Sequence, residues 1–167
     1  SAELKDVTFQ GTIPQKIYVL GSLDFDNLSG AVLVSGNASS NFVVSGYQDG
    51  NVIEFTPSES EYVGGTKVLQ KSDAMDEEEF KAACSAIAVT PKSDGSSWYI
   101  NEEGKLEKYI VASIALKDST ETFSTLKAAV EYVNNNGGTG TADAMEIVVL
   151  TNASISETLE IRKNATI

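Results

Sequence analysis

Short apolar runs alternate with turn residues along the first third of the chain. The runs are rich in β-branched and aromatic residues, and the residues between them are mostly Gly, Ser, Asn and Asp. Such runs are typical of strands, and such breakers are typical of turns. We therefore expect strands at residues 7–9, 16–20, 23–25, 31–34, 41–44 and 51–55. Strands that recur about every ten residues favour a sandwich, a barrel or a β-helix.

Asp49-Gly50 lies between two of these runs, 41–44 and 51–55. An Asp-Gly pair between apolar runs is a hairpin signal, because Gly adopts positive φ without strain. The same pair also suits a tight corner between rungs of a β-helix. The sequence leaves both readings open.

A first helix is expected in the middle third, after a short strand at 67–69. Ser72 or Asp73 is the expected N-cap, and the acidic residues 76–79 occupy the first turns, where the helix dipole favours them. We read these acids as a solvated helix start in preference to a metal site. The helix should end at 85–87. Its apolar face has the spacing i, i+3, i+4, i+7 and consists of Phe80, Ala83, Cys84 and Ile87.

Residues 98–106 read as a hairpin with its turn at 101–104, and residues 109–116 read as a strand. The clearest helix follows, with Phe123, Leu126, Ala129, Val130 and Val133 on one face. Thr122 or Ser124 can cap its start, and the Asn and Gly residues of 134–138 can end it in the left-handed conformation. Further strands are expected at 147–150 and, from its apolar–polar alternation, at 155–161.

Four features follow one another in the C-terminal block: the amphipathic segment 123–133, the run 147–150, the run 155–161, and Lys163-Asn164-Ala165-Thr166-Ile167. In this order they resemble the opening of a right-handed parallel β-helix of the pectate-lyase-like superfamily. In that family an amphipathic helix covers the open end of the coil, and the resemblance implies this role for 123–133. The segments 44–58 and 98–106 resemble, more loosely, late parts of large bacterial surface proteins. The catalytic Arg and Asp clusters of the family's enzymes have no counterpart that aligns here.

These patterns predict a mainly β chain with two short helices, either parallel β-helix-like or, failing that, an α+β sandwich. We expect a strand-rich block at 1–62, a mixed block with the acidic helix and the hairpin at 63–118, and a block at 119–167 with the cap helix and the first β-helix strands. The three blocks are compatible with one packed module. The abrupt C-terminal end leads us to expect a fragment of a longer protein.

The chain of 167 residues carries a net charge of -12, from 24 acidic and 12 basic residues. Such a surface repels phosphate, so we expect no nucleic-acid partner. Ca²⁺ or a basic partner would be the functional reading of the acidity, and solubility is the simpler one. No apolar run approaches the roughly 18–20 residues that a membrane-spanning helix needs. The single cysteine excludes an internal disulfide. Bacterial surface modules commonly lack disulfides, whereas secreted eukaryotic domains of this size often use them.

Groups that carry out catalysis are scarce. The chain has no histidine, which excludes Ser-His-Asp triads, Cys-His dyads and most zinc sites. Cys84 is expected to be a buried, inert thiol. Asp24 and Asp26, at i and i+2 of a strand, point to one side and are the candidate metal ligands or acid/base pair. A solvent-facing strand flank is the reading we prefer for them. We therefore expect no cofactor, with Ca²⁺ as the alternative.

Four aromatic residues near the expected loops are the candidate ligand-binding residues: Tyr47, Tyr62, Trp98 and Tyr99. A flat ring exposed at a loop can stack on the face of a sugar. Core packing is the use that we expect first for Trp98, because a lone tryptophan is usually well buried.

Three functional hypotheses follow, in this order. The first is a non-enzymatic structural or adhesive module of a bacterial surface or secreted protein, located outside the cell or at its surface, whose partner is a glycan or a host or neighbouring surface protein. The second is a carbohydrate-binding module that uses the four aromatic residues. The third is a non-catalytic fragment of a polysaccharide-active enzyme.

Overall fold

The computed structural model describes residues 1–11, 15–36, 41–138, 144–151, 158–163 and 165–166. The chain is mainly β with two helices, as predicted, and its strands form several separate sheets. It divides into two compact units, unit 1 at 1–108 and unit 2 at 109–167. This division does not coincide with the expected block boundaries at 62 and 118.

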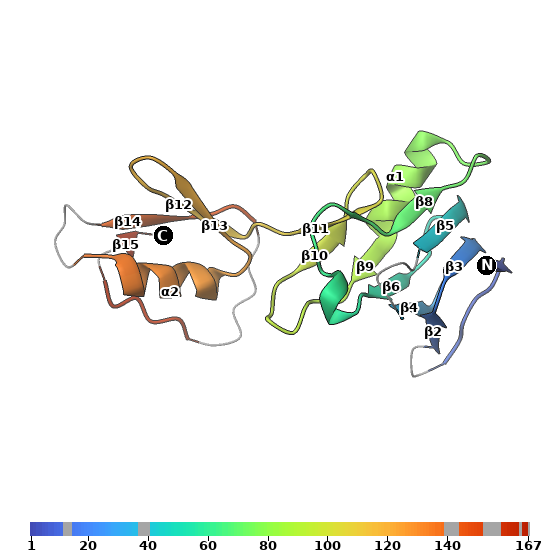
Figure 1. Ribbon diagram of the computed structural model, residues 1–167, viewed down its shortest axis with the longest axis horizontal. Helices are drawn as coiled ribbons and strands as arrows, with labels where there is room; N and C mark the ends of the chain where they lie inside the picture. Colours follow the sequence, from blue (N-terminus) through green and yellow to red (C-terminus); the bar gives the residue numbers. More distant parts are fainter. Residues whose placement is uncertain (12–14, 37–40, 139–143, 152–157, 164, 167) are drawn as a thin grey trace. The chain divides into compact units, whose positions relative to one another are not determined.

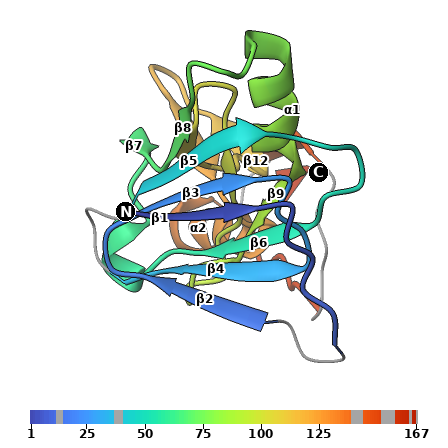
Figure 2. The ribbon, with the colours of Figure 1, turned by 90° about the vertical axis from the view of Figure 1, so that its right-hand side faces the viewer.

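Two parallel four-stranded sheets make up most of unit 1, with the orders β1-β3-β5-β8 and β2-β4-β6-β9. Their strands are β1 Ala2–Lys5, β2 Gln15–Val19, β3 Ser22–Asp26, β4 Ala31–Ser35, β5 Asn41–Gly46, β6 Ile53–Thr56, β8 Leu69–Lys71 and β9 Ile87–Val89. The chain alternates between the sheets, and each new strand adds beside the previous strand of its own sheet (Figure 2). We call one strand of the first sheet together with the next strand of the second sheet a repeat.

Equivalent side chains of successive repeats stack in columns between the sheets. In the first sheet Leu23 is in register with Phe42, and Phe42 with Leu69. In the second sheet Leu33 is in register with Phe55. The rings of Phe42 and Phe55 meet edge to face with centroids 5.1 Å apart, so the two sheets share one core.

The corner after the first strand of a repeat also recurs. Asp6 and Asn27 follow β1 and β3, and both adopt the left-handed conformation with φ of 50° and 49°. The side-chain amide of Asn27 donates to Oδ1 of Asp6 over 3.2 Å. Two residues further on, Thr8 and Ser29 form a parallel bridge. The stacking therefore continues from the strands into the corners.

Asp49-Gly50 lies at such a corner, because β5 and β6 on either side of it belong to different sheets. Gly50 has a φ of 90°, which its lack of a side chain permits. The hairpin reading is therefore wrong, and Asp49-Gly50 lies in a corner between two strands that do not pair with each other.

The rest of unit 1 closes over the β8–β9 end of the two sheets. It comprises the short 3-10 helix η1 Glu59–Glu61, β7 Thr66–Lys67, α1 Glu77–Ala86, β10 Trp98–Ile100 and β11 Lys105–Lys108. The strands β10, β11 and β7 form an antiparallel sheet, which confirms the hairpin expected at 98–106 and adds β7 to it.

The helix α1 buries Phe80, Ala83 and Cys84, as its apolar spacing predicts, and packs against β5, β9 and β10. Its N-cap is Asp76, whose carboxylate accepts a 2.8 Å hydrogen bond from the backbone N–H of Glu79. The expected caps Ser72 and Asp73 are wrong because the chain forms a turn there before the helix begins.

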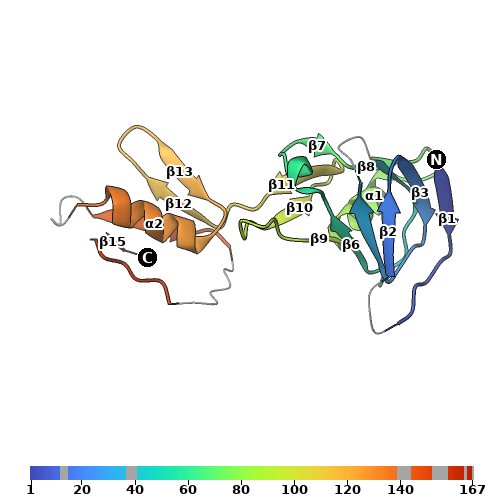
Figure 3. The same ribbon diagram turned by 60° about the horizontal axis from the view of Figure 1, so that its bottom comes forward.

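Unit 2 is a four-stranded sheet with α2 along one face (Figures 1 and 3). Its elements are β12 Ala112–Ala115, β13 Thr120–Phe123, α2 Leu126–Asn136, β14 Met145–Val149 and β15 Ala165–Thr166, in the sheet order β13-β12-β14-β15. The helix buries Ala129, Val130 and Val133 in a core with Ile114 and Ile147.

Three details of unit 2 differ from the expectations. Phe123 belongs to β13, and the N-cap is Thr125, whose hydroxyl accepts from the N–H of Ala128. Gly137 at the other end has a φ of -72°, so no left-handed cap ends the helix there. Of the strand expected at 155–161, residues 155–157 lie outside the described residues, and 158–161 are not a strand. No helix in the described part of the chain is long and apolar enough to cross a membrane.

Candidate functional site

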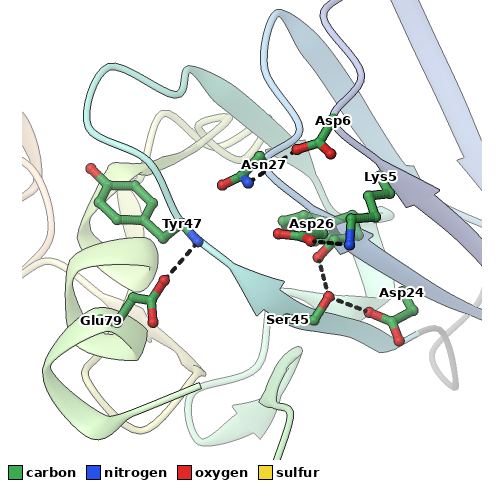
Figure 4. Close-up of polar contacts among 9 residues, drawn as sticks. Lys5, Asp6, Asp24, Asp26, Asn27, Ser45, Tyr47 and Glu79 are labelled. Carbon is green, nitrogen blue, oxygen red and sulfur yellow. Dashed lines mark hydrogen bonds and ion pairs between the residues drawn. The ribbon is translucent and has the colours of Figure 1, made fainter. Parts of the chain in front are cut away.

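The candidate metal ligands Asp24 and Asp26 lie on the outer face of the first sheet (Figure 4). Leu23 and Phe25 of the same strand are buried in the core, and the period of two along a strand turns the intervening carboxylates outward. Both acids are half-buried by their neighbours on β1 and β5. The expectation that they share one side of a strand is consistent with this arrangement.

Each of the two carboxylates has its own partner. Oδ2 of Asp26 lies 3.5 Å from Nζ of Lys5 on β1. Oδ1 of Asp24 accepts a 3.2 Å hydrogen bond from Oγ of Ser45, which also lies 3.2 Å from the carbonyl oxygen of Phe25. The pairing of β3 with β5 shifts its register beside Ser45, and this irregularity lets the serine reach back across the face.

The outer face offers few further ligands for a cation. Among the described residues, no group of three or more Asp, Glu, Cys or His side chains could hold a metal ion together. Ca²⁺ takes six to eight oxygen ligands, so Asp24 and Asp26 would depend on water or backbone oxygens for most of them. A calcium site at this pair therefore remains a prediction from sequence.

Two further contacts tie this face to its surroundings (Figure 4). The Asn27–Asp6 hydrogen bond links the two stacked corners, and Oε1 of Glu79 on α1 accepts a 3.1 Å hydrogen bond from the backbone N–H of Tyr47. The half-buried Tyr47 lines a cavity of about 10 Å³, which has room for about one water molecule. This cavity is too small for a sugar ring.

Trp98 and Tyr62 pack against each other inside unit 1. Each is only 7% exposed, and their ring centroids lie 5.6 Å apart. Nε1 of Trp98 donates to Oγ of Ser96 over 2.9 Å, and the hydroxyl of Tyr62 donates to the carbonyl of Thr90 over 2.7 Å. Burial raises the pKa of Tyr62, and the negative charge of the nearby Glu59 raises it further. Both candidate residues therefore pack in the core. Core packing is the use expected first for Trp98, and it is confirmed.

The other aromatic side chains differ in exposure. Tyr99 on β10 is half-buried and in register with Glu107. Tyr18 on β2, which the sequence analysis did not select, is 67% exposed. Its place between two inward residues of a predicted strand, Ile17 and Val19, is the alternation signal that could have found it.

Cys84 is buried on the inner face of α1, which confirms the expectation of a buried thiol. Burial raises its pKa to about 11. The thiol is therefore protonated at neutral pH and is a poor nucleophile.

A shallow groove of about 370 Å³ lies in unit 2 between α2 and residues 158–162. The side chain of Asn134 holds this segment in place. Its amide donates to the carbonyl of Glu160 over 2.8 Å, and its Oδ1 accepts from the N–H of Arg162 over 2.7 Å. Lys127 and Glu131 also line the groove, so its walls carry both signs of charge. The sequence analysis did not select any of these residues.

Comparison with known proteins finds no relative of this chain. The chain matches no protein-family model, and it has no significant match among curated proteins or solved structures. Its function must therefore be argued from its own residues.

Proposed function

We propose that the repeats of unit 1 are turns of a parallel β-helix, and that the chain is a non-enzymatic structural module of a bacterial surface or secreted protein. Its task is to act as a stiff spacer that holds adjoining segments at a fixed separation. The observation that carries this proposal is the alternation of the chain between two parallel sheets whose side chains stack in register.

The repeats are joined to one another in several independent ways. Each strand is hydrogen-bonded along a parallel ladder, the columns share one core, and the corners add bonds of their own. At the corners the N–H of Phe9 donates to the carbonyl of Ser29 over 3.0 Å, and the N–H of Gly30 donates to the carbonyl of Val52 over 2.7 Å. A repeat cannot bend away from the next one without breaking all three kinds of contact, which favours stiffness.

The chemistry of the outer face also supports a structural role. Asp24 and Asp26 each contact a neighbouring side chain of the same sheet, and Cys84 is buried and protonated at neutral pH. Neither of these two carboxylates lines the small cavity beside Tyr47. The proposal of a cell-surface location rests on the sequence alone, through the resemblance and the absence of a disulfide.

Carbohydrate binding is the second candidate function, and exposed Tyr18 is the observation that favours it. Tyr47 and Tyr99 are half-buried, and Trp98 and Tyr62 would have to leave the core in order to stack on a sugar. The aromatic residues to test are therefore Tyr18, Tyr47 and Tyr99. Trp98→Ala is unsuitable, since truncation of a buried tryptophan costs about 3–5 kcal/mol of stability.

The two candidates are separated by retention of the purified chain on a panel of insoluble and immobilised polysaccharides, with and without Ca²⁺. The structural proposal predicts no saturable binding and no release of reducing ends. Binding that Tyr18→Ala abolishes, while Tyr109→Ala leaves it intact, would replace the spacer with a carbohydrate-binding module. Release of reducing ends would contradict every non-catalytic reading of the chain, the spacer included.

A further inference from the structure

The chain contains a single Asn-Gly pair, Asn136-Gly137, at the C-terminal end of α2. In such a pair the backbone nitrogen of the glycine can attack the side-chain carbonyl carbon of the asparagine, because the glycine has no side chain to hinder the approach. The asparagine then loses its amide without the help of an enzyme. Asn136 is exposed, so water reaches it. The pair therefore has both the sequence and the exposure that deamidation requires.

The folded helix holds the two reacting atoms apart. The side-chain amide of Asn136 donates a 2.9 Å hydrogen bond to the carbonyl of Tyr132, one turn earlier in α2. Side chains of a helix lean towards its N-terminus, whereas the nitrogen of Gly137 lies on the C-terminal side of Asn136. That nitrogen also donates its hydrogen to the carbonyl of Val133 over 2.7 Å. Attack therefore requires both hydrogen bonds of the last helical turn to open.

We propose that Asn136 is a site of spontaneous deamidation, and that fraying of the last turn of α2 sets its rate. The nitrogen of Gly137 gives its proton to solvent and bonds to Cγ of Asn136. The bond between Cγ and Nδ2 then breaks, and the leaving nitrogen takes a proton from solvent and departs as ammonia. The five-membered succinimide that remains is opened by water at either carbonyl, which gives aspartate or isoaspartate. Water and the chain are the only reactants, and nothing is oxidised or reduced.

Deamidation weakens the end of α2. Either product places a negative charge at the C-terminus of the helix, where the helix dipole disfavours it. Isoaspartate also adds a methylene group to the backbone between residues 136 and 137. The backbone at Gly137 is closely packed, since a Cβ atom added there would lie 2.7 Å from the carbonyl oxygen of Val133 and 3.1 Å from Cβ of Lys163. The modification therefore disturbs the contact of α2 with residue 163 in unit 2.

The fold slows this reaction without preventing it. Terminal turns of helices open at little cost in free energy, and each hydrogen bond that must break contributes only modestly. We therefore expect Asn136 to deamidate about tenfold more slowly in the folded chain than in the unfolded chain. This inference goes beyond the proposed spacer function and does not depend on it.

Peptide mapping by mass spectrometry tests the proposal. The full chain is kept in neutral buffer, with and without enough urea to unfold it, and conversion of Asn136 is followed over time. Asn135→Gly and Asn135→Ala are matched variants, because they leave the Asn-Gly pair intact and change the helix propensity beside it. In the folded chain the glycine variant should deamidate about fivefold faster than the alanine variant. In urea the two variants should react at the same rate.

Equal rates of deamidation in the folded and unfolded chains, or in the two folded variants, overturn the proposal. An Asn136 that stays unmodified in urea also overturns it, because the pair is then not reactive. So does an Asn136 that reacts in urea but stays unmodified in the folded chain, because fraying of α2 then does not reach the reactive geometry. None of these results bears on the spacer function, whose test is polysaccharide binding.

Discussion

Ser35 donates a 2.6 Å hydrogen bond to Oε1 of Glu61, and both side chains are buried. The other oxygen, Oε2, accepts from the backbone N–H and the hydroxyl of Ser58 over 2.8 Å and 2.7 Å. Three donors therefore hold one carboxylate, which fastens η1 to β4 of the second sheet. A buried carboxylate is destabilising without hydrogen-bond donors, and these donors are left without an acceptor if the carboxylate is removed.

Removal of the Glu61 carboxylate should be costly. We expect Glu61→Ala to lower the free energy of unfolding by about 3 kcal/mol, because buried donors lose a charged acceptor, and Glu61→Gln to lower it by about half as much. The measurement is chemical denaturation followed by circular dichroism. Glu59→Ala, on the same short helix but exposed, is the control, with an expected loss below about 1 kcal/mol. Equal losses of unfolding free energy in Glu61→Ala and in the control would show that the buried carboxylate contributes no more to stability than an exposed one.

Gly104 should not tolerate a side chain. Its φ is 75°, and a Cβ there would overlap the backbone carbonyl of Leu69 and approach the ring of Phe80 at 3.0 Å. We expect Gly104→Ala to cost about 3 kcal/mol or more, since backbone strain and a clash add. Gly95→Ala is matched in φ, at 82°, but meets nothing within 4 Å, so it isolates the strain at about 1–2 kcal/mol. Thermal unfolding of both variants should show a clearly lower Tm for Gly104→Ala, and identical Tm values would contradict the packing of the β10–β11 turn on β8.

Two variants of Asn27 test the stacked corners, because they distinguish the contribution of its backbone conformation from that of its side-chain hydrogen bond. Asn27→Gly keeps the left-handed φ but loses the bond to Asp6, and we expect a loss of about 1 kcal/mol. Asn27→Ala loses the hydrogen bond and also strains the left-handed backbone, so it should lower the free energy of unfolding by about 1 kcal/mol more than the glycine variant. Urea denaturation measures the difference. A glycine variant less stable than the alanine variant would mean that residue 27 does not adopt the left-handed conformation.

Stability should fall in alkaline solution because of Cys84. Its pKa is about 11 in the folded chain, against an ordinary value of 9.0. Between these values the unfolded chain releases the thiol proton before the folded chain does, so the free energy of unfolding decreases as pH rises from 9 towards 11. The decrease attributable to this thiol is about 2–3 kcal/mol. Cys84→Ala should remove this part of the pH dependence, and denaturation curves at pH 7 and about pH 10.5 compare the two chains. The same slope in both would show that the thiol is not responsible.

Strand and helix positions were largely predictable because they depend on local patterns. The apolar face of α1 and the Trp98–Leu106 hairpin follow from spacing and turn residues, which act over a few neighbours. The caps were missed because several residues near each start can accept the same hydrogen bond. The polar segment 57–61 contains the buried Glu61, whose partner Ser35 is remote in the sequence, so the segment itself carries no signal of this burial.

The repeat was harder to find, since the length of chain between equivalent positions changes from one repeat to the next. Leu23, Phe42 and Leu69 share a column, but the last interval holds the inserted residues of η1 and β7. The burial of Trp98 was expected, whereas the burial of Tyr62 was not, because it depends on the ring of Trp98 and the carbonyl of Thr90. Contacts of this kind between distant segments leave no local signal in a single sequence.

Pulling the full chain between its ends in optical tweezers tests most directly whether unit 1 is one stiff structural element. We expect unit 1 to hold as a whole and to open in one step. Such a step should lengthen the chain by roughly 350–390 Å, less the folded end-to-end distance, at about 3.3–3.6 Å per residue. Unit 2 should give a separate, smaller step. Opening of unit 1 through a series of small extensions at low force, with β1 to β4 leaving first, would contradict a spacer.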